Sequence, residues 1–122
     1  MKDRRLFPRI ESDWPLFFIT GEQKKQIGYV RNISLTGAEL FFFKEQDLDP
    51  DKTNFILKLR NPQMTPEDLT LEGLREWSQT EEEEATLSLS LEEVKGEKRK
   101  NFVRYLSRSD KLHVEAFLYH KD

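Results

Sequence analysis

A regular alternation of side chains in two stretches limits the possible folds more than any other feature of this sequence. In residues 54–60 the large apolar residues Phe55, Leu57 and Leu59 occupy every second position, and the same spacing recurs in residues 85–91. Successive side chains of a β-strand point to opposite faces of the sheet, so this spacing predicts strands with one buried face. The chain is therefore expected to be mainly β.

Four more stretches have the composition of strands, and turn residues separate them. We expect strands over residues 13–20, 26–34, 37–43, 54–60, 69–77 and 85–91. Gly73 interrupts the alternation of the fifth stretch, which indicates a β-bulge there. Residues 111–119 have apolar spacings that fit either a last strand or a short helix, and the sequence leaves both open.

The spacing of apolar residues changes after residue 91, where Val94, Phe102, Val103 and Leu106 lie at helical intervals. Acidic residues come first in this segment, and Lys and Arg dominate its later part, which is the order that a helix dipole favours. A C-terminal α-helix is therefore expected at about residues 92–108.

Five or six antiparallel strands with one later helix fit a small β-barrel, because closure of a sheet removes its exposed edges. The length of 122 residues fits a single domain. Residues 1–12 show no periodicity and include Pro8, so we expect a flexible N-terminal arm there. The barrel domain is then expected to occupy residues 13–122.

The composition argues against several classes of protein. The chain has no cysteine, which rules out disulfides, thiol catalysis and thiolate metal sites. Its net charge of -3 argues against general affinity for nucleic acid, which needs a basic surplus. No apolar run approaches the roughly 20 residues that span a bilayer, and the N-terminus lacks the apolar core of a signal peptide. We therefore expect a cytoplasmic protein without a membrane span.

Residues 31–37 read RNISLTG and lie between two apolar runs, as the bend of a β-hairpin would. Asn32 and Ser34 are two positions apart, so an extended backbone brings both side chains to one face. Gly37 allows either a positive φ or a close approach of the backbone to a ligand. The segment is therefore a candidate hydrogen-bonding platform.

A cationic cluster lies near the N-terminus, where Arg5 and Arg9 are four positions apart and Arg4 adjoins them. Guanidinium groups fit phosphate oxygens or the edge of a guanine through paired hydrogen bonds. The platform and the arginines together indicate a phosphorylated ligand that carries guanine.

The two motifs, RLFPR at residues 5–9 and NISLTG at residues 32–37, resemble in order and spacing the R-x-x-x-R and [D/N]-x-S-x-x-G motifs of the PilZ domain. This domain is the bacterial receptor for cyclic diguanylate (cyclic di-GMP, or c-di-GMP). The resemblance covers most of the chain. It implies a six-stranded antiparallel β-barrel with a C-terminal α-helix, acting as a second-messenger receptor whose ligand is cyclic di-GMP and which has no cofactor.

The resemblance also implies a role for each motif residue. Arg5 and Arg9 would contact phosphates and guanine edges. Asn32 and Ser34 would hydrogen-bond a guanine and its neighbouring phosphate, and Gly37 would let the ligand approach the backbone.

Two further contacts and an output follow from the same resemblance. In similar proteins an arginine at the position of Arg4 contacts a second nucleotide, so an intercalated dimer of cyclic di-GMP is expected. Trp77 is a strand aromatic that would form the barrel wall and border the ligand. The arm would close over the ligand, and a downstream protein effector would read the change in shape and charge.

Plainer interpretations of the motif residues also exist. Arginines near a chain end are commonly solvated, and polar side chains in a turn commonly satisfy the local backbone. A protein-interaction adaptor on the same fold, without nucleotide binding, is therefore the alternative function. A small barrel that binds single-stranded nucleic acid through the basic arm is a third class, which the acidic net charge disfavours.

Catalytic and metal-binding constellations are not evident in the sequence. His113 and His120 lie at its end and are expected at the surface, and no nucleophile elbow surrounds Ser34. Two histidines without a patterned carboxylate do not make a metal site, and the acidic run at residues 81–84 is expected to be a solvated turn. We therefore expect neither an enzyme nor a metal site.

Overall fold

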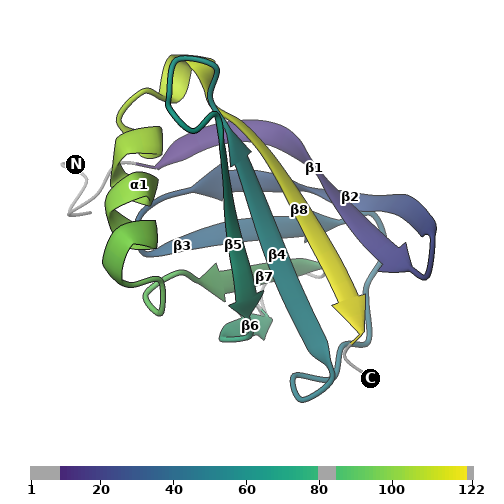
Figure 1. Ribbon diagram of the computed structural model, residues 1–122. Coiled ribbons are helices and arrows are strands. Elements are labelled where there is room, and N and C mark those ends of the chain that lie inside the picture. Colours follow the sequence, from purple (N-terminus) through teal and green to yellow (C-terminus); the bar gives the residue numbers. More distant parts are fainter. Residues whose placement is uncertain (1–8, 80–84, 121–122) are drawn as a thin grey trace, which may run out of the picture.

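The computed structural model describes residues 9–79 and 85–120, which form one eight-stranded sheet, one α-helix and a short 3₁₀-helix (Figure 1). The elements are β1 (Ile10–Thr20), β2 (Gln23–Ile33), β3 (Gly37–Phe42), β4 (Thr53–Arg60), β5 (Asp68–Leu74), β6 (Trp77–Gln79), β7 (Thr86–Ser90), α1 (Gly96–Leu106), η1 (Ser109–Lys111) and β8 (His113–His120).

The sheet has the strand order β5-β4-β8-β1-β2-β3-β7-β6 and curls strongly into a half-barrel. In Figure 1, β5, β4 and β8 cross in front of β1, β2 and β3, and α1 lies beside one end of the sheet. A mainly β fold with one α-helix is therefore confirmed. The predicted number of six strands is wrong, because the described residues form eight.

One extra strand arises because residues 69–77 do not form a single strand. They divide into β5 and β6, which lie at opposite edges of the sheet. The predicted bulge is confirmed just before this division: Gly73 has a φ of +71°, and the register between β4 and β5 shifts between Phe55 and Leu57. The chain leaves the sheet after Leu74 and returns at Trp77 on the other edge.

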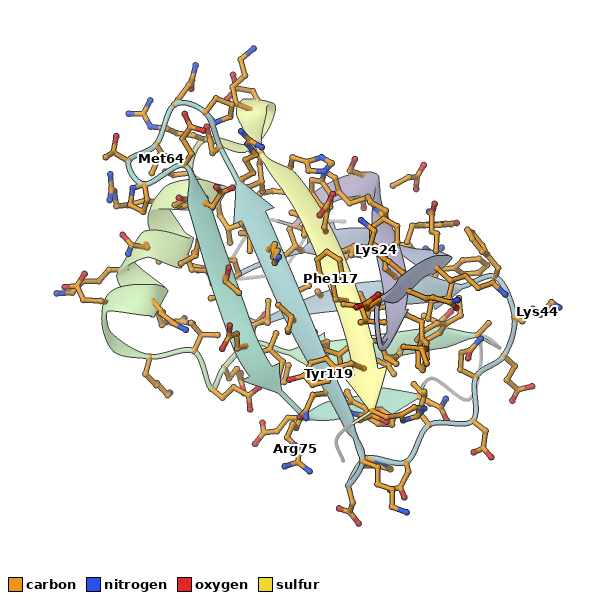
Figure 2. All side chains as sticks on the ribbon, turned by 45° about the vertical axis from the view of Figure 1, so that its right-hand side comes forward. Lys24, Lys44, Met64, Arg75, Phe117 and Tyr119 are labelled. Carbon is orange, nitrogen blue, oxygen red and sulfur yellow. The ribbon has the colours of Figure 1, made fainter. Side chains whose placement is uncertain are left out.

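The other extra strand is β8, which decides the open question about residues 111–119 in favour of a strand. It lies between β4, with which it pairs antiparallel, and β1, with which it pairs parallel. The sheet is therefore not wholly antiparallel, and α1 is not the last element, because β8 follows it. Burial of Phe117 on one face and of Val114, Ala116 and Leu118 on the other is typical of such a central strand. Figure 2 shows Phe117 on the outer face, near Lys24.

The first strand begins at Ile10 rather than at Asp13, because Ile10 and Glu11 pair with Ile33 and Asn32 of β2. Residues 10–12 of the predicted arm thus belong to the sheet. Arg9 directly precedes β1, and residues 1–8 of the arm lie outside the described residues, as does the predicted acidic turn at residues 81–84.

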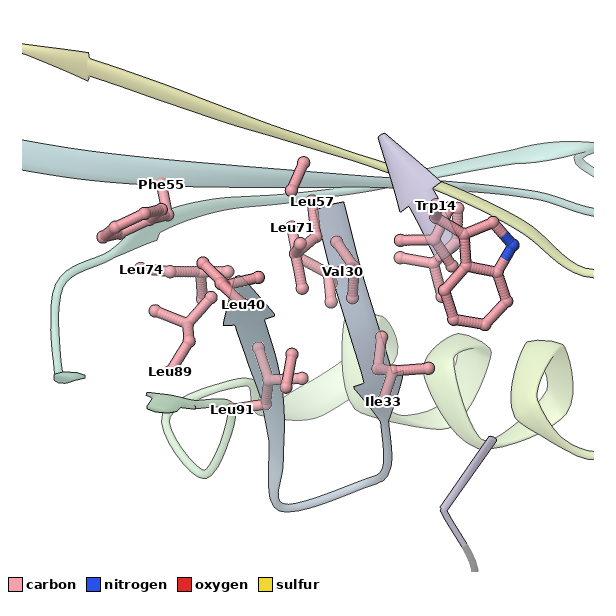
Figure 3. Packing of buried hydrophobic residues seen from close by; sticks show 14 of the residues in the cluster. Trp14, Val30, Ile33, Leu40, Phe55, Leu57, Leu71, Leu74, Leu89 and Leu91 are labelled. Carbon is pink, nitrogen blue, oxygen red and sulfur yellow. The ribbon is translucent and has the colours of Figure 1, made fainter. Parts of the chain in front are cut away.

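The core fills the space between the two halves of the curled sheet (Figure 3). Phe55, Leu57 and Leu59 of β4 are fully buried, as their alternation predicts. From the other half of the sheet come Trp14, Leu16, Val30, Leu40, Leu87 and Leu89. Each such side chain contributes about 1.5–3 kcal/mol on burial, so these contacts dominate the stability of the fold.

The helix is shorter than predicted, because Gly96 has a φ of +64° and α1 continues only to Leu106. Phe102 and Tyr105 pack into the core, and the Tyr105 hydroxyl donates a hydrogen bond to the carbonyl oxygen of Pro66. Val103, predicted for the apolar face, is exposed. At 11 residues, α1 is the only α-helix of the described chain and is too short to cross a membrane.

Candidate functional site

A concave site of about 400 Å³ lies on the outer face of β3, β7 and β6, beside the end of β2. Five of the seven predicted site residues line it: Arg9, Asn32, Ser34, Gly37 and Trp77. The other two, Arg4 and Arg5, lie outside the described residues. The site therefore unites the hairpin segment with Arg9 and Trp77, which are far from it in sequence.

A row of polar side chains crosses four neighbouring strands at this site, and we call it the polar row. The strand registers pair Asn32 with Glu39, Glu39 with Ser88, and Ser88 with Ser78. Glu39 and Ser88 each lie between buried residues along their strands, so their side chains point away from the core. The polar row is thus presented to solvent along the floor of the concave site.

A β-bulge in β2 arranges one end of the polar row. The register with β3 shifts between Val30 and Asn32, so Arg31 is the extra residue. As a result Arg31 and Asn32 both reach Glu39: Arg31 Nη1 is 3.3 Å from Glu39 Oε1, and Asn32 Nδ2 is 3.5 Å from Glu39 Oε2. The Glu39 carboxylate therefore accepts from two neighbours of the same strand.

The loop between β2 and β3 confirms the predicted hairpin and satisfies much of its own polarity. The Ser34 amide donates to the carbonyl oxygen of Gly37 at 2.8 Å. The Ser34 hydroxyl accepts from the Thr36 amide at 3.3 Å and lies 3.2 Å from the Thr36 hydroxyl. Arg99 of α1 also donates to the carbonyl oxygen of Leu35 at 3.2 Å. Ser34 is therefore a structural residue of the loop as well as a lining residue of the site.

Gly37 is required by close packing of the backbone and not by a positive φ, which the structure does not give it. A Cβ atom at this position would lie 2.8 Å from the carbonyl oxygen of Leu89 in β7. The group that approaches Gly37 closely in the structure is thus the chain itself, and its predicted approach to a ligand stays a prediction.

Trp77 serves both the core and the site. Its ring meets that of Phe55 edge-on, with centroids 6.1 Å apart, and it also lines the concave site. The indole Nε1–H is buried and has no hydrogen-bond partner among the described residues. An unpaired buried donor costs about 1–3 kcal/mol, so an acceptor at this position would be favourable.

Acidic side chains are the main feature that the sequence interpretation missed. Glu39 and Glu76 line the site together with Arg9. The pKa of Glu93 is raised, first by burial and then by the charge of Glu76, which indicates that negative charge extends beyond the site. A second hollow of about 600 Å³ shares Arg9, Asn32 and Glu39 with the first, so Glu39 stands between two concave surfaces.

Other missed residues are the small hydroxyl side chains that complete the lining, namely Thr36, Ser78, Ser88 and Ser90. Their outward orientation could be predicted for Ser88 and Ser90, because they alternate with Leu87 and Leu89. Their proximity to Asn32 could not be predicted from the sequence, because it depends on the pairing of β3 with β7.

The described residues contain no group of three or more His, Asp or Glu side chains that could hold a metal ion. His113 and His120 are exposed, as expected, and His113 lies 3.7 Å from the carboxylate of Glu115. The arrangement around the site offers hydrogen-bond donors, acceptors and one aromatic ring, and it is suited to binding.

Comparison of the chain with protein-family models, with curated proteins and with solved structures found no match.

Proposed function

We propose that the chain is a receptor for cyclic di-GMP that binds its ligand in the manner of a PilZ domain. The observation that carries this proposal is the convergence of Arg9, Asn32, Ser34, Gly37 and Trp77 on one concave site. These residues come from three separate parts of the chain, namely Arg9 before β1, the hairpin segment at residues 32–37, and Trp77 at the start of β6. Their meeting at one surface is what a shared ligand requires.

The size and chemistry of the site suit a nucleotide. Small-molecule sites commonly measure about 300–1,000 Å³ and combine apolar walls with a few polar groups. In this proposal Trp77 borders a base, Asn32 supplies an amide for its edge, and Arg9 supplies a guanidinium for a phosphate.

The charge of the described lining makes the N-terminal arginines essential to the proposal. Arg9 is cationic, whereas Glu39 and Glu76 are anionic, so these three alone do not favour a phosphorylated ligand. Arg4 and Arg5 would supply the missing positive charge when the N-terminal segment closes over the ligand. Ordering that segment costs about 1–2 kcal/mol per residue, so several charge-assisted bonds are needed to offset it.

In this proposal the output is a change at the protein surface. Closure of the N-terminal segment neutralises its arginines and alters the shape of the face around the polar row. A downstream protein effector in the cytoplasm then distinguishes the two states. The receptor itself carries out no reaction.

Isothermal titration calorimetry with cyclic di-GMP, GTP and cyclic di-AMP tests the proposal. We expect selective binding of cyclic di-GMP, with a stoichiometry near two if Arg4 holds an intercalated dimer. Arg9→Ala should weaken binding by about 1.5–3 kcal/mol, the scale of hydrogen bonds to charged groups. Lys24→Ala is the matched control, because Lys24 packs over Phe17 and does not line the site. Equal affinity of both variants would contradict the role of Arg9.

A protein-interaction adaptor on this fold is the second candidate, and a specific observation favours it. The polar groups expected to meet the nucleotide already contact the chain itself: Asn32 donates to Glu39, and Ser34 bonds within its loop. Absence of binding heat together with an unchanged melting temperature in cyclic di-GMP would favour the adaptor.

A further inference from the structure

The side chain of Asn32 has two chemically opposite ends, and its neighbour decides which end meets a ligand. The amide NH₂ group only donates hydrogen bonds, and the carbonyl oxygen only accepts them. In the structure Asn32 Nδ2 lies 3.5 Å from Glu39 Oε2, and Asn32 lines both concave surfaces. The orientation of this amide therefore sets the hydrogen-bonding character of the site at that point.

Glu39 can hold the amide in one orientation, because Glu39 is itself restrained. Its Oε1 atom is 3.3 Å from Arg31 Nη1, and its side chain is only 28% exposed. The Arg31 guanidinium in turn lies 5.8 Å from the centre of the Phe41 ring. The bulge at Arg31 brings all these groups to the same face of the sheet.

An ionised carboxylate has no proton to donate, so only the NH₂ end of Asn32 can face Glu39 favourably. The carbonyl end is then turned away from Glu39 and remains as an acceptor. We propose that Glu39 is a positioning residue that makes Asn32 an acceptor and thereby selects a ligand edge rich in donors. This inference rests on the proposed function, in which that edge belongs to guanine.

Guanine and adenine differ in the hydrogen-bonding groups that they would present to the Asn32 oxygen. The Watson–Crick edge of guanine carries two neighbouring donors, N1–H and the N2 amino group, which suit a carbonyl oxygen. Adenine presents an unprotonated N1 at the equivalent position, and this acceptor would face the Asn32 oxygen unfavourably. Glu39 would thus set the preference for guanine over adenine without touching the base.

The test compares the ratio of the dissociation constants for cyclic di-AMP and cyclic di-GMP in the wild type and in Glu39→Gln. Glutamine has nearly the same shape but can donate as well as accept, so Asn32 becomes free to turn. We expect the preference for guanine to fall by at least about fivefold, the lower end of the value of one paired base contact. The melting temperature verifies that the variant is folded.

Glu76→Gln is the matched control, because it removes the same charge from the same site, whereas the Asn32 amide donates to Glu39. It should raise the affinity for both nucleotides alike and leave their ratio unchanged. Adding Asn32→Asp to Glu39→Gln should restore the preference for guanine, because a carboxylate accepts whichever way it turns. A purely structural role of Glu39 would not produce this rescue.

The outcomes separate this inference from the proposed function. Absence of binding by the wild type to either nucleotide overturns both. Selective binding by the wild type, with the same ratio in Glu39→Gln, overturns the role of Glu39 alone. A loss of selectivity in Glu39→Gln that Asn32→Asp restores supports both.

Discussion

Two regions on the outer face of the same sheet use opposite chemistry. The first is the polar row of Asn32, Glu39, Ser88 and Ser78 across β2, β3, β7 and β6. The second, which we call the aromatic cluster, consists of Phe17, Phe117, Lys24 and Lys58 over β1, β2, β8 and β4. Both arise from side chains that alternate with the core. The polar row lines the concave site, whereas no residue of the aromatic cluster lines either of the two hollows described above.

The members of the aromatic cluster cover one another. The rings of Phe17 and Phe117 stack with centroids 5.5 Å apart. Lys24 Nζ lies 4.5 Å from the centre of the Phe17 ring, and Lys58 Nζ lies 5.2 Å from that of Phe117. Figure 2 shows Lys24 and Phe117 close together on this face. The lysine stems thus bury an apolar surface that the sheet leaves on its outer side.

The aromatic cluster is built for stability, and the polar row is open to recognition. In the aromatic cluster each group already has its partner, so little is left for a ligand. In the polar row the hydroxyl groups of Ser78 and Ser88 are small and leave a hollow beside Trp77. We infer that changes in the aromatic cluster lower stability with little effect on binding, and that changes in the polar row do the reverse.

The largest expected effect is the loss of stability in Phe117→Ala. Phe117 is only 6% exposed although it lies on the outer face, so its removal should cost about 3 kcal/mol of unfolding free energy. Urea unfolding measures this loss. Ser88→Ala, in the polar row, should change stability by less than about 0.5 kcal/mol. Similar losses of unfolding free energy in the two variants would contradict the proposed difference between the two regions.

Gly37→Ala should have the next largest effect on stability, and it tests whether packing requires this glycine. The added Cβ would meet the carbonyl oxygen of Leu89 at 2.8 Å, and the backbone of β7 cannot give way cheaply. We expect a loss of about 1–3 kcal/mol of unfolding free energy in thermal or urea denaturation. An unchanged stability would mean that Gly37 is kept for a ligand and not for packing.

Lys24→Gln tests the electrostatic part of the aromatic cluster. It keeps most of the apolar stem but removes the charge above the Phe17 ring, so a loss of about 0.5–1 kcal/mol in stability is expected. The same variant should bind cyclic di-GMP like the wild type. Weaker binding of cyclic di-GMP by this variant would show that the aromatic cluster takes part in ligand recognition.

The smallest effect concerns pH and the acidic side of the site. Burial and then Glu76 raise the pKa of Glu93 above its ordinary value of 4.5, so the folded state holds this proton more tightly than the unfolded state does. As pH rises from 4.5 through the raised pKa, ionisation of Glu93 makes the folded state less stable.

Glu93→Gln should therefore raise stability slightly at neutral pH and have no effect below the ordinary pKa. Urea unfolding at neutral pH and at a pH below the ordinary pKa measures the difference in unfolding free energy between the variant and the wild type. A gain of the same size at both would point to a cause other than ionisation.

Local patterns in the sequence predicted much of the sheet. The alternation around Leu57 placed β4 and its buried face, Gly73 marked the bulge, and the NISLTG segment marked the hairpin between β2 and β3. These features depend on neighbours in the sequence, for which side-chain period and turn chemistry are sufficient.

Features that depend on distant parts of the chain were not predictable in the same way. The insertion of β8 between β4 and β1 joins strands more than 50 residues apart in the sequence, and no local pattern encodes it. Likewise, the proximity of Ser88 to Glu39 follows from the register of β7 on β3. The bulge at Arg31, which brings Asn32 to Glu39, contains no glycine that would indicate it in the sequence.

An NMR titration with cyclic di-GMP decides whether the polar row borders a site for this ligand. Trp77 lines the site and offers a well-separated indole Nε1–H signal, and Trp14, buried in the core, supplies the internal control. We predict that ligand shifts the Trp77 indole signal and the amide signals of residues 34–37 and 88–90, but not those around Phe117. Signal shifts that gather around Phe117 and Lys24, or no shifts at saturating ligand, would contradict the proposed site.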